Sequence, residues 1–259
     1  MSIKKFIMSG LALGTMLMAS APAHATDFDL GTLNVGTNKT QPVTSPNFSF
    51  DVFKFNHAGG ELNLGVVNVT NGKKFRISLY QDTDKDGKYN PTKDTVVNRS
   101  QFGADNGDRE IFSREPAATY FAIVTPVTSA SATYTFIASN TGSQPSNVLA
   151  DSVVLSTTNA QFNNFSLNDD HTSDFYQVSL FSGQQVSITT TPHNGQAQMR
   201  VIKDAVADRI VTPNYEIVNS TPASSQPQTL TVKGPGTYYL QVSQSVAGQT
   251  VATDVKFSP

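Results

Sequence analysis

The densest group of side chains capable of chemistry in this sequence is an acidic loop in its first half. Residues 82–94 read DTDKDGKYNPTKD, with aspartates at Asp82, Asp84, Asp86 and Asp94. Calcium takes six to eight oxygen ligands, and acids at alternate positions before a glycine can curl around one ion. Gly87 supplies the backbone freedom that such a tight turn needs. The loop therefore predicts a calcium site.

The spacing follows an EF-hand loop only in part. The first three acids fill the first, third and fifth positions, and the backbone carbonyl of Lys88 fills the seventh. Lys93 stands at the twelfth position, where a bidentate acid is expected, and Asp94 comes one residue late. No helical pattern flanks the loop, so we expect it on a β-hairpin. The predicted ligands are Asp82, Asp84, Asp86, Lys88 and Asp94.

A solvated hairpin turn without an ion is the alternative, because Asp-Gly is a common turn dipeptide. Four carboxylates so close together would repel one another without a cation, which favours the ion. Later in the chain, residues 204–208 occupy the equivalent place but lack the alternating acids, and we expect no ion there. Asp105, Asp108 and Glu110 form a second acidic cluster, which is more typical of a surface loop than of a contributor of a metal ligand.

Catalytic patterns are missing from the sequence. His57, His171 and His193 stand alone, and we expect His57 and His193 on exposed turns beside glycines. The chain contains no His-Glu-x-x-His, no Gly-x-Ser-x-Gly and no glycine-rich phosphate loop. It also has no cysteine, which excludes thiol catalysis and cysteine-held metal centres. We expect no enzyme, although convergent sites can hide in sequence and a cryptic hydrolase stays open.

The composition of the chain limits the classes of partner that we expect. Charged residues make up 15% of the chain and the formal net charge is −2, whereas soluble proteins average about 25% charged residues. No basic stripe is present that could neutralise phosphates, so nucleic acid is not an expected partner. The polar, uncharged surface suits an extracellular β-protein.

The first residues predict export. Lys4 and Lys5 precede an apolar run from Phe6 to Met18, and residues 23–25 supply the small-x-small pattern of a cleavage site. We expect a signal peptide over residues 1–25. The run is too short for a membrane anchor, which needs about 20 apolar residues. The mature protein is therefore expected to be secreted or periplasmic, without a membrane span.

Short alternating segments follow the signal peptide. Each is about five to eight residues long and ends in Gly, Pro, Asn or Asp, as strands do. Examples are Leu62–Val66, Phe75–Leu79, Tyr120–Val124 and Tyr134–Phe136. Phe53 and Phe55 break the phase set by Phe50 and Val52, which indicates either a bulge or a strand buried on both faces. In the aromatic pairs at 120–121 and 238–239, one ring of each is expected inside.

The second half repeats the first at an offset of about 120 residues. The matched segments are 51–55 with 174–178, 75–82 with 197–204, and 118–124 with 236–242. The polar residues 140–150, which contain Gly and Pro, read as a linker between the copies. We expect one β-sandwich domain over residues 26–139 and a divergent second one over residues 151–259.

These motifs resemble bacterial pre-peptidase C-terminal domains. The resemblance lies in the opening Asp29–Leu33, the Asp-x-aromatic strand at Asp51, the Leu-Tyr-x-Asp strand end at Tyr80, and the Gly-Thr-Tyr-Tyr-Leu strand at Gly236. It implies an all-β architecture of two tandem jelly-roll-like sandwiches. Such domains usually trail a secreted hydrolase and help with secretion, calcium-dependent stability or substrate binding, and related domains carry similar acidic loops.

No segment of catalytic size precedes the repeats in this sequence, so the resemblance implies the accessory role without an attached peptidase. We expect an exported, non-catalytic binding or accessory protein, stabilised by Ca²⁺, which contacts extracellular polysaccharide, a cell-surface component or a protein. A structural spacer of a surface or matrix is the alternative. The oligomeric state is left open by the sequence.

Overall fold

The computed structural model describes residues 23–46, 49–70, 73–100, 109–127, 131–143, 148–149, 152–207, 210–211 and 213–259. Over these residues the chain forms strands β1 to β18 and a single helical turn, α1 (Pro213–Glu216). The all-β prediction is confirmed. Most of the predicted signal peptide lies outside the described residues, and β1 begins at Ala23.

The first half of the chain holds nine strands. They are β1 (Ala23–Leu33), β2 (Thr37–Ser45), β3 (Ser49–His57), β4 (Gly60–Val67), β5 (Phe75–Gln81), β6 (Thr95–Arg99), β7 (Arg109–Glu115), β8 (Ala118–Pro126) and β9 (Ala132–Gly142). They make a five-stranded sheet in the order β1-β3-β8-β5-β6 and a four-stranded sheet in the order β2-β9-β4-β7. We call this sandwich domain 1.

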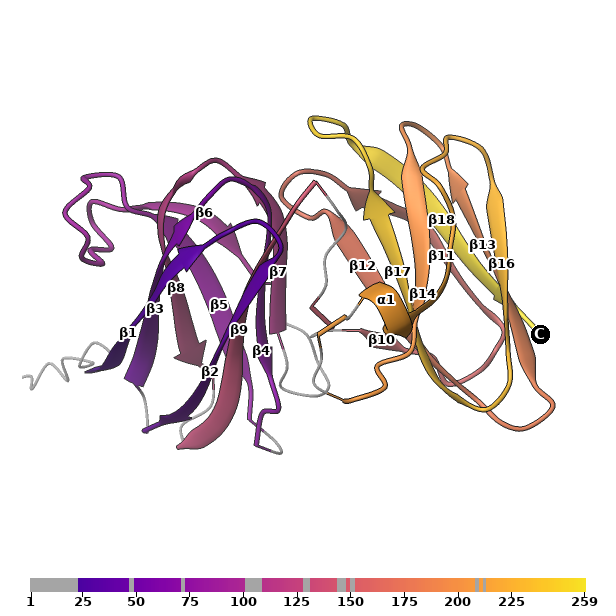
Figure 1. Cartoon of the computed structure of the whole chain (residues 1–259), viewed down its shortest axis with the longest axis horizontal. Helices are drawn as coiled ribbons and strands as arrows, with labels where there is room; N and C mark the ends of the chain where they lie inside the picture. Colours follow the sequence, from indigo (N-terminus) through magenta and orange to yellow (C-terminus); the bar gives the residue numbers. More distant parts are fainter. Residues whose placement is uncertain are drawn as a thin grey trace, which may run out of the picture.

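The second half holds the other nine. They are β10 (Val153–Val154), β11 (Ala160–Leu167), β12 (Ser173–Leu180), β13 (Gln185–Pro192), β14 (Ala197–Ile202), β15 (Ile217–Ser220), β16 (Gln228–Lys233), β17 (Gly236–Gln244) and β18 (Val251–Ser258). Their sheets run β10-β12-β17-β14-β15 and β11-β18-β13-β16. This sandwich is domain 2, and it lies beside domain 1 in Figure 1.

The two domains share one strand plan. The three sequence matches fall on β3 and β12, β5 and β14, and β8 and β17, which occupy the same places in the two five-stranded sheets. Each of these sheets also opens with a parallel edge pair, β1 with β3 and β10 with β12. Duplication of one ancestral domain stays a prediction. Such a duplication would produce two domains with the same strand order.

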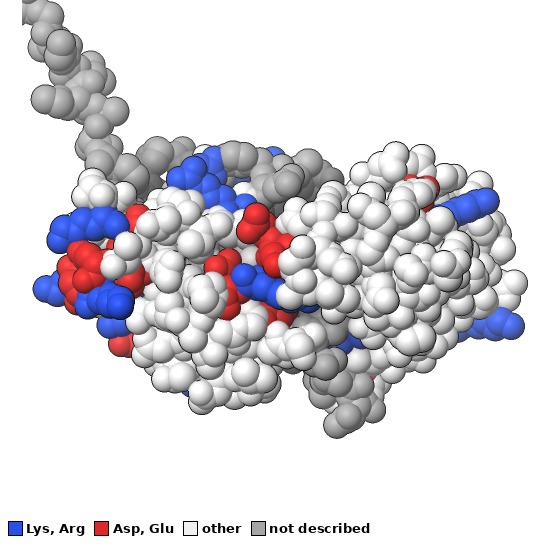
Figure 2. All heavy atoms as spheres, turned by 90° about the horizontal axis from the view of Figure 1, so that it is seen from above, with Lys and Arg blue, Asp and Glu red and all other residues white. Residues whose placement is uncertain are grey.

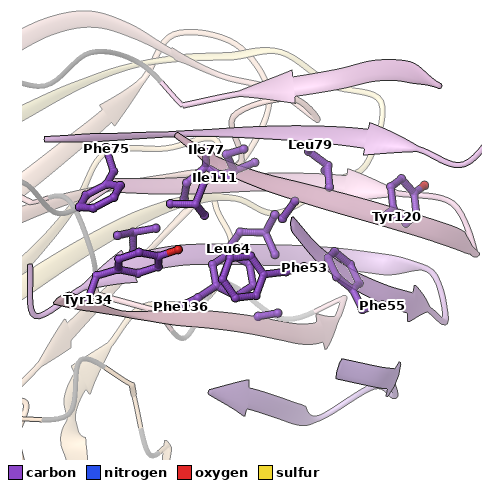
Figure 3. Close-up of a cluster of buried hydrophobic side chains, with 14 of the residues drawn as sticks. Phe53, Phe55, Leu64, Phe75, Ile77, Leu79, Ile111, Tyr120, Tyr134 and Phe136 are labelled. Carbon is purple, nitrogen blue, oxygen red and sulfur yellow. The ribbon is translucent and has the colours of Figure 1, made fainter. Parts of the chain in front are cut away.

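Alternating side chains of domain 1 meet in a core rich in phenylalanine (Figure 3). Phe53 lies between Phe28 and Phe136, with ring centroids 4.9 Å and 4.0 Å away. Burying a side chain of this size contributes about 1.5–3 kcal/mol, so this stack is a main source of stability. Val52 is buried on the opposite face of β3, and the pairing of β3 with β8 is unbroken. Strand β3 is therefore buried on both faces and carries no bulge along β8.

The paired aromatics divide between the two faces of their strands, as expected. Tyr120 and Tyr238 point into the cores of domains 1 and 2, whereas Phe121 and Tyr239 belong to clusters outside the sandwiches. The hydroxyl of Tyr120 donates to the carbonyl of Pro116 at 2.9 Å, and that of Tyr238 to the carbonyl of Lys233 at 3.3 Å. Each tyrosine thus ties the start of its strand to the preceding turn.

The two domains pack face to face through an apolar cluster. Phe112 from the four-stranded sheet of domain 1 meets Phe175 from the five-stranded sheet of domain 2, with ring centroids 5.5 Å apart. Val148 and Leu149, within the predicted linker, are fully buried in this cluster. The other buried members are Val67, Ile137, Ile202, Val211 and Tyr239. The outer faces of two sheets therefore shield each other from water.

Polar contacts surround this cluster. The backbone N–H of Arg114 donates to the carbonyl of Asp169 at 2.8 Å, and that of Thr172 to the carbonyl of Phe112 at 3.2 Å, so the edge strand β7 pairs with a turn of domain 2. The guanidinium of Arg114 reaches the carboxylate of Asp169 at 3.1 Å and the side-chain carbonyl of Gln244 at 2.7 Å. Pairing of this kind protects a strand edge that would otherwise be open.

Glu61 is the acid buried in this junction. Its side chain is 1% exposed, and its carboxylate accepts a hydrogen bond from the Thr172 hydroxyl of domain 2 and lies 3.6 Å from Nε of Arg114. Burial raises the pKa of Glu61 to about 7, although the Thr172 hydrogen bond and the charge of Arg114 act in the opposite direction. The junction therefore binds a proton more tightly than the unfolded chain does.

Among the described residues, no helix is long and apolar enough to cross a lipid bilayer.

Replacing Glu61 with glutamine tests the junction. A carboxyl with a raised pKa stabilises the fold below its unfolded value of 4.5, and this contribution is lost as the pH rises through about 7. The wild-type protein should therefore lose up to about 3 kcal/mol of unfolding free energy between pH 5 and pH 8 through this group. The glutamine side chain can still accept from Thr172, so E61Q should lack this loss in urea unfolding at the two pH values.

D29N is the matched control, because Asp29 is exposed on β1 and lies in the other sheet of domain 1. This variant should keep the wild-type difference between pH 5 and pH 8. An equally large pH-dependent loss in E61Q would show that Glu61 does not carry it.

Candidate metal site

Residues 82–94 form the connection between β5 and β6. It projects from the end of domain 1 that lies away from domain 2 (Figure 1), where acidic and basic side chains gather (Figure 2). Strand β5 ends at Gln81, and the N–H of Asp82 donates to the carbonyl of Thr119 on β8 at 3.0 Å. The first acid is therefore fixed to the sheet, and the later ones follow on the loop.

Three of the predicted ligands come together. Carboxylate oxygens of Asp82, Asp84 and Asp86 all lie within 4.8 Å of one another, with Asp82 buried and the other two exposed. Within the described residues, no other three acids or histidines approach one another this closely. The loop thus concentrates negative charge at one point, which a divalent cation would offset.

Backbone N–H groups orient these carboxylates. Asp82 Oδ2 accepts from the N–H of Gly87 at 3.1 Å, Asp84 Oδ1 from that of Asp86 at 3.3 Å, and Asp86 Oδ1 from that of Lys88 at 2.8 Å. Gly87 has a φ of +71°, a conformation that glycine adopts readily. The turn thus holds one oxygen of each acid through a backbone N–H.

The other oxygen of Asp82 decides how well the site fits a metal. Asp82 is 7% exposed, and its Oδ1 is buried and accepts no hydrogen bond from the described residues. Leaving a buried charged oxygen without a partner is costly, on the order of several kcal/mol. A hard cation bound by this oxygen would remove the cost, so the donor set fits calcium.

The Asp94 side chain lies apart from the group formed by Asp82, Asp84 and Asp86. Its Oδ1 accepts from the N–H of Thr83 at 3.3 Å and its Oδ2 from that of Asn90 at 2.6 Å. The side chain is 7% exposed and closes the loop by joining its two arms. Asp94 is therefore outside the group gathered by Asp82, Asp84 and Asp86, and both of its oxygens face backbone donors.

Lys93 supplies a positive charge to the acid group. Its Nζ lies 3.0 Å from Asp84 Oδ2, and this contact holds the pKa of the Asp84 carboxyl below its usual value and raises the pKa of Lys93. Exposed pairs of this kind contribute little to stability, because solvent screens the two charges. Lys93 occupies the position of the missing closing acid, and it would compete with a cation for Asp84.

Tyr89 attaches the loop to the sheet, a role that the sequence pattern did not indicate. Its ring centroid lies 5.0 Å from that of Tyr80, 6.0 Å from Phe121 and 6.2 Å from Phe50, with each ring pair steeply tilted. These aromatics and the buried Val52 and Ile123 form a cluster on the outer face of the five-stranded sheet. In the sequence, the only indication of this aromatic cluster was the 120–121 pair, in which one ring, Phe121, had to point outward.

The histidines lie at three separate places. His57, expected on an exposed turn, is in fact 3% exposed at the end of β3, where it packs against Tyr120 and contacts Asn140. Burial lowers the pKa of His57, so it is held as a neutral ring. His171 pairs with Asp174 at 2.7 Å, and the exposed His193 pairs with Asp254 at 3.0 Å.

Of the remaining acidic segments, only part lies within the described residues. Asp204 follows β14 at the place equivalent to Asp82, and Asp208 lies outside the described residues. Asp105 and Asp108 also lie outside them. The gathered acids of domain 1 are therefore the one candidate metal site within the described part of the chain.

Comparison with known proteins gives distant likenesses only. No family model matches the chain, and no curated protein matches it. Among solved structures it is similar to the pre-peptidase C-terminal domain of a collagenase from Bacillus anthracis. That likeness is 18% identical, covers 43% of this chain and 93% of the other, and has a TM-score of 0.33.

Two further solved structures are similar over more of the chain. The CUB1-EGF-CUB2 domains of rat MASP-1 are 5% identical, cover 90% of this chain and 100% of their own, and give a TM-score of 0.28. The PBSX exported protein XepA is 6% identical, with coverage of 87% and 83% and a TM-score of 0.25. Since each TM-score is below 0.5, these likenesses carry no functional argument, and the residues of this chain must supply it.

Truncating Tyr89 tests how the loop is held. Tyr89→Ala should lower the free energy of unfolding by about 1–3 kcal/mol, because a partly buried aromatic contact is lost. Tyr89→Phe keeps the ring and should stay within about 0.5 kcal/mol of wild type. Urea unfolding of the three proteins measures both values, and equal stability of Y89A and wild type would contradict the anchoring role.

Proposed function

We propose that the protein is an exported, non-catalytic binding or accessory protein whose domain 1 is stabilised by calcium. The observation that carries the calcium part is the buried Asp82 Oδ1, which lacks a hydrogen-bond donor among the described residues. Asp82 is also one of three aspartates that bring carboxylate oxygens within 4.8 Å of one another. Asp82, Asp84 and Asp86 hold the ion through side chains, and the carbonyl of Lys88 and the nearby Asp94 are the further candidates.

The charge balance of the loop supports this assignment. Residues 82–94 contain four aspartates and three lysines, a formal charge of −1. Only one of these lysines, Lys93, forms a described ion pair with the acid group. A divalent ion would neutralise the gathered carboxylates more completely than one mobile ammonium does, because it binds several oxygens at once.

The binding role rests on the signal-like first residues and on the motif resemblance to pre-peptidase C-terminal domains, twice along the chain. We propose that both sandwiches are domains of this kind. Extracellular polysaccharide, a cell-surface component or a secreted protein is the proposed partner. His57, His171 and His193 lie at separate places, and none of them belongs to the acid group.

A rigid spacer is the second candidate function, favoured by the buried junction between the domains. Phe112, Phe175 and Glu61 fix the two sandwiches against each other, as a spacer would require. Pull-down on insoluble polysaccharides and on collagen separates the two functions. Retention on one of these matrices supports binding, and no retention on any of them supports the spacer.

Calcium should raise the melting temperature of the full chain. A ligand that binds only the folded state at a hundred times its Kd stabilises by about 2.7 kcal/mol. For a protein of this size that corresponds to a rise of roughly 5–10 °C between chelator and calcium. Asp82→Asn should abolish the rise, and because it removes a buried charge it should melt no lower than wild type in chelator.

D29N serves as the control in this experiment and should keep the full calcium response. Scanning calorimetry measures all three proteins under the same conditions. An unchanged melting temperature of the wild type in calcium, or a full response in D82N, contradicts the proposed metal site.

Changing Lys93 to glutamate should strengthen calcium binding. The substitution removes the ammonium paired with Asp84 and places an acid at the position where a closing ligand is expected. A change of two charges beside a divalent ion should lower the Kd by about tenfold or more. K39E makes the same charge change on β2 and should leave the Kd within about twofold in calcium titration. Weaker binding by K93E would contradict the competing role of Lys93.

A further inference from the structure

A hollow in the surface of domain 1 lies directly beside the acid group. Its volume is about 560 Å³, within the roughly 300–1,000 Å³ of small-molecule sites. It forms where β3, β5 and β8 meet the loop between β5 and β6. Its polar lining includes Lys54, Asn56, Gln81, Asp82, Lys85 and Asp86.

The hollow and the acid group share a wall. Asp82 and Asp86, two of the three gathered acids, belong to the lining of the hollow. Asp82 is 7% exposed, and its Oδ1 accepts no hydrogen bond from the described residues. A buried charged oxygen of this kind is stable only with a partner, which a bound ion would supply. A ligand in the hollow would therefore lie next to that ion.

The loop would leave a bound calcium ion short of oxygen ligands. It offers three carboxylates and one backbone carbonyl, those of Asp82, Asp84, Asp86 and Lys88, whereas calcium takes six to eight oxygens. Lys93 stands where an EF-hand loop has its bidentate acid, and both oxygens of Asp94 already accept from backbone N–H groups. A carboxylate that enters through the hollow can supply the missing oxygens.

Two lysines of the lining can meet the charge of such a carboxylate. Within the described part of the chain, neither Lys54 nor Lys85 forms an ion pair. Lys54 stands on β3 and lies against the turn of the loop, because a Cβ placed on Gly87 would lie 3.1 Å from its Nζ. Ammonium groups bind anionic oxygens as point charges. Lys54 and Lys85 are therefore available to an anion beside the acid group.

A divalent ion would change the sign of the charge in the hollow. Lys54 and Lys85 offset Asp82 and Asp86, so the formal charge of the lining is zero. Calcium held by the acids would add two positive charges and attract an anion. Calcium should therefore favour binding of the anion, and the anion should tighten calcium by the same factor.

The rest of the lining favours a ligand that carries hydroxyl groups. Oδ1 of Asn56 accepts from the Thr119 hydroxyl at 2.8 Å, which fixes the amide and lets its Nδ2 donate to a ligand. Gln81 adds a second amide. The apolar members of this lining are Ala117 and Ala118, so it offers little contact to an apolar ligand. A carboxylate together with hydroxyl groups describes a uronic acid.

We propose that this hollow binds a uronate unit of an acidic polysaccharide, with its carboxylate shared between the calcium ion and Lys54 and Lys85. The sugar hydroxyls meet the amides of Asn56 and Gln81. This inference rests on the proposed calcium site and binding function, and it names their ligand class and its place. An acidic peptide offers the same carboxylate without the hydroxyls and should bind more weakly.

The test is calorimetric titration of the full chain with trigalacturonate, in calcium and in chelator, with a blank titration into each buffer. Wild type should bind trigalacturonate in calcium and at least about tenfold more weakly in chelator, because the ion supplies a direct contact and two charges. Neutral maltotriose should give no heat in either buffer, since it has no carboxylate.

The double variant K54Q/K85Q separates the hollow from the metal site. It should bind trigalacturonate at least about tenfold more weakly, because two charge-assisted contacts are lost. It should bind calcium alone at least as tightly as wild type, because both lost charges are positive. The control K39Q/K256Q removes two positive charges from exposed lysines of β2 and β18 and should bind trigalacturonate within about twofold of wild type.

Circular dichroism and the melting temperature of each variant show that it is folded before titration. The proposal is overturned if chelator leaves the affinity for trigalacturonate unchanged, if K54Q/K85Q binds it as well as wild type, or if hexaglutamate binds as tightly. If wild type binds calcium but not trigalacturonate, this inference fails and the calcium site stands. If wild type binds neither of them, both fail.

Discussion

Side chains of a β-strand point alternately to its two faces, so every sheet of a sandwich has an inner face in the core and an outer face that must be wetted or covered. In this protein two of the outer faces cover each other. The four-stranded sheet of domain 1 contributes Val67, Phe112 and Ile137, and the five-stranded sheet of domain 2 contributes Phe175 and Tyr239. The junction that results joins two sandwiches of the same strand order into one packed unit.

The outer face of the other sheet in domain 1 is covered only in part. Tyr89 folds back onto Phe50, Tyr80 and Phe121 and leaves an open pocket beside two arginines. The loop that carries Tyr89 has to bring three carboxylates together at its other side. Repulsion among these acids opposes the fold of the loop, and Lys93 offsets part of it at Asp84. A bound divalent cation would offset more of it.

Much of this arrangement could be predicted from the sequence, for physical reasons. Period-two alternation identified the strands, because a half-buried strand needs it, and the acids before Gly87 were found because their spacing matches a turn. The junction was missed, although adjacent apolar pairs such as Val66–Val67, Ile111–Phe112 and Phe136–Ile137 place one residue on each face. His57 was wrongly expected on the surface, because the glycines after it suggested a turn while β3 runs through it. The direction of the Asp94 side chain depends on backbone donors 4 and 11 residues away, which spacing alone does not reveal.

The central claim is that the acid group of domain 1 binds one calcium ion. Calorimetric titration of the metal-stripped full chain with calcium tests it most directly, because it counts sites. The account predicts one ion per chain, since domain 2 lacks the alternating acids, and a loss of that site in a chain with Asp82, Asp84 and Asp86 all changed to asparagine. Absence of saturable binding, or one ion still bound by the triple variant, would contradict it.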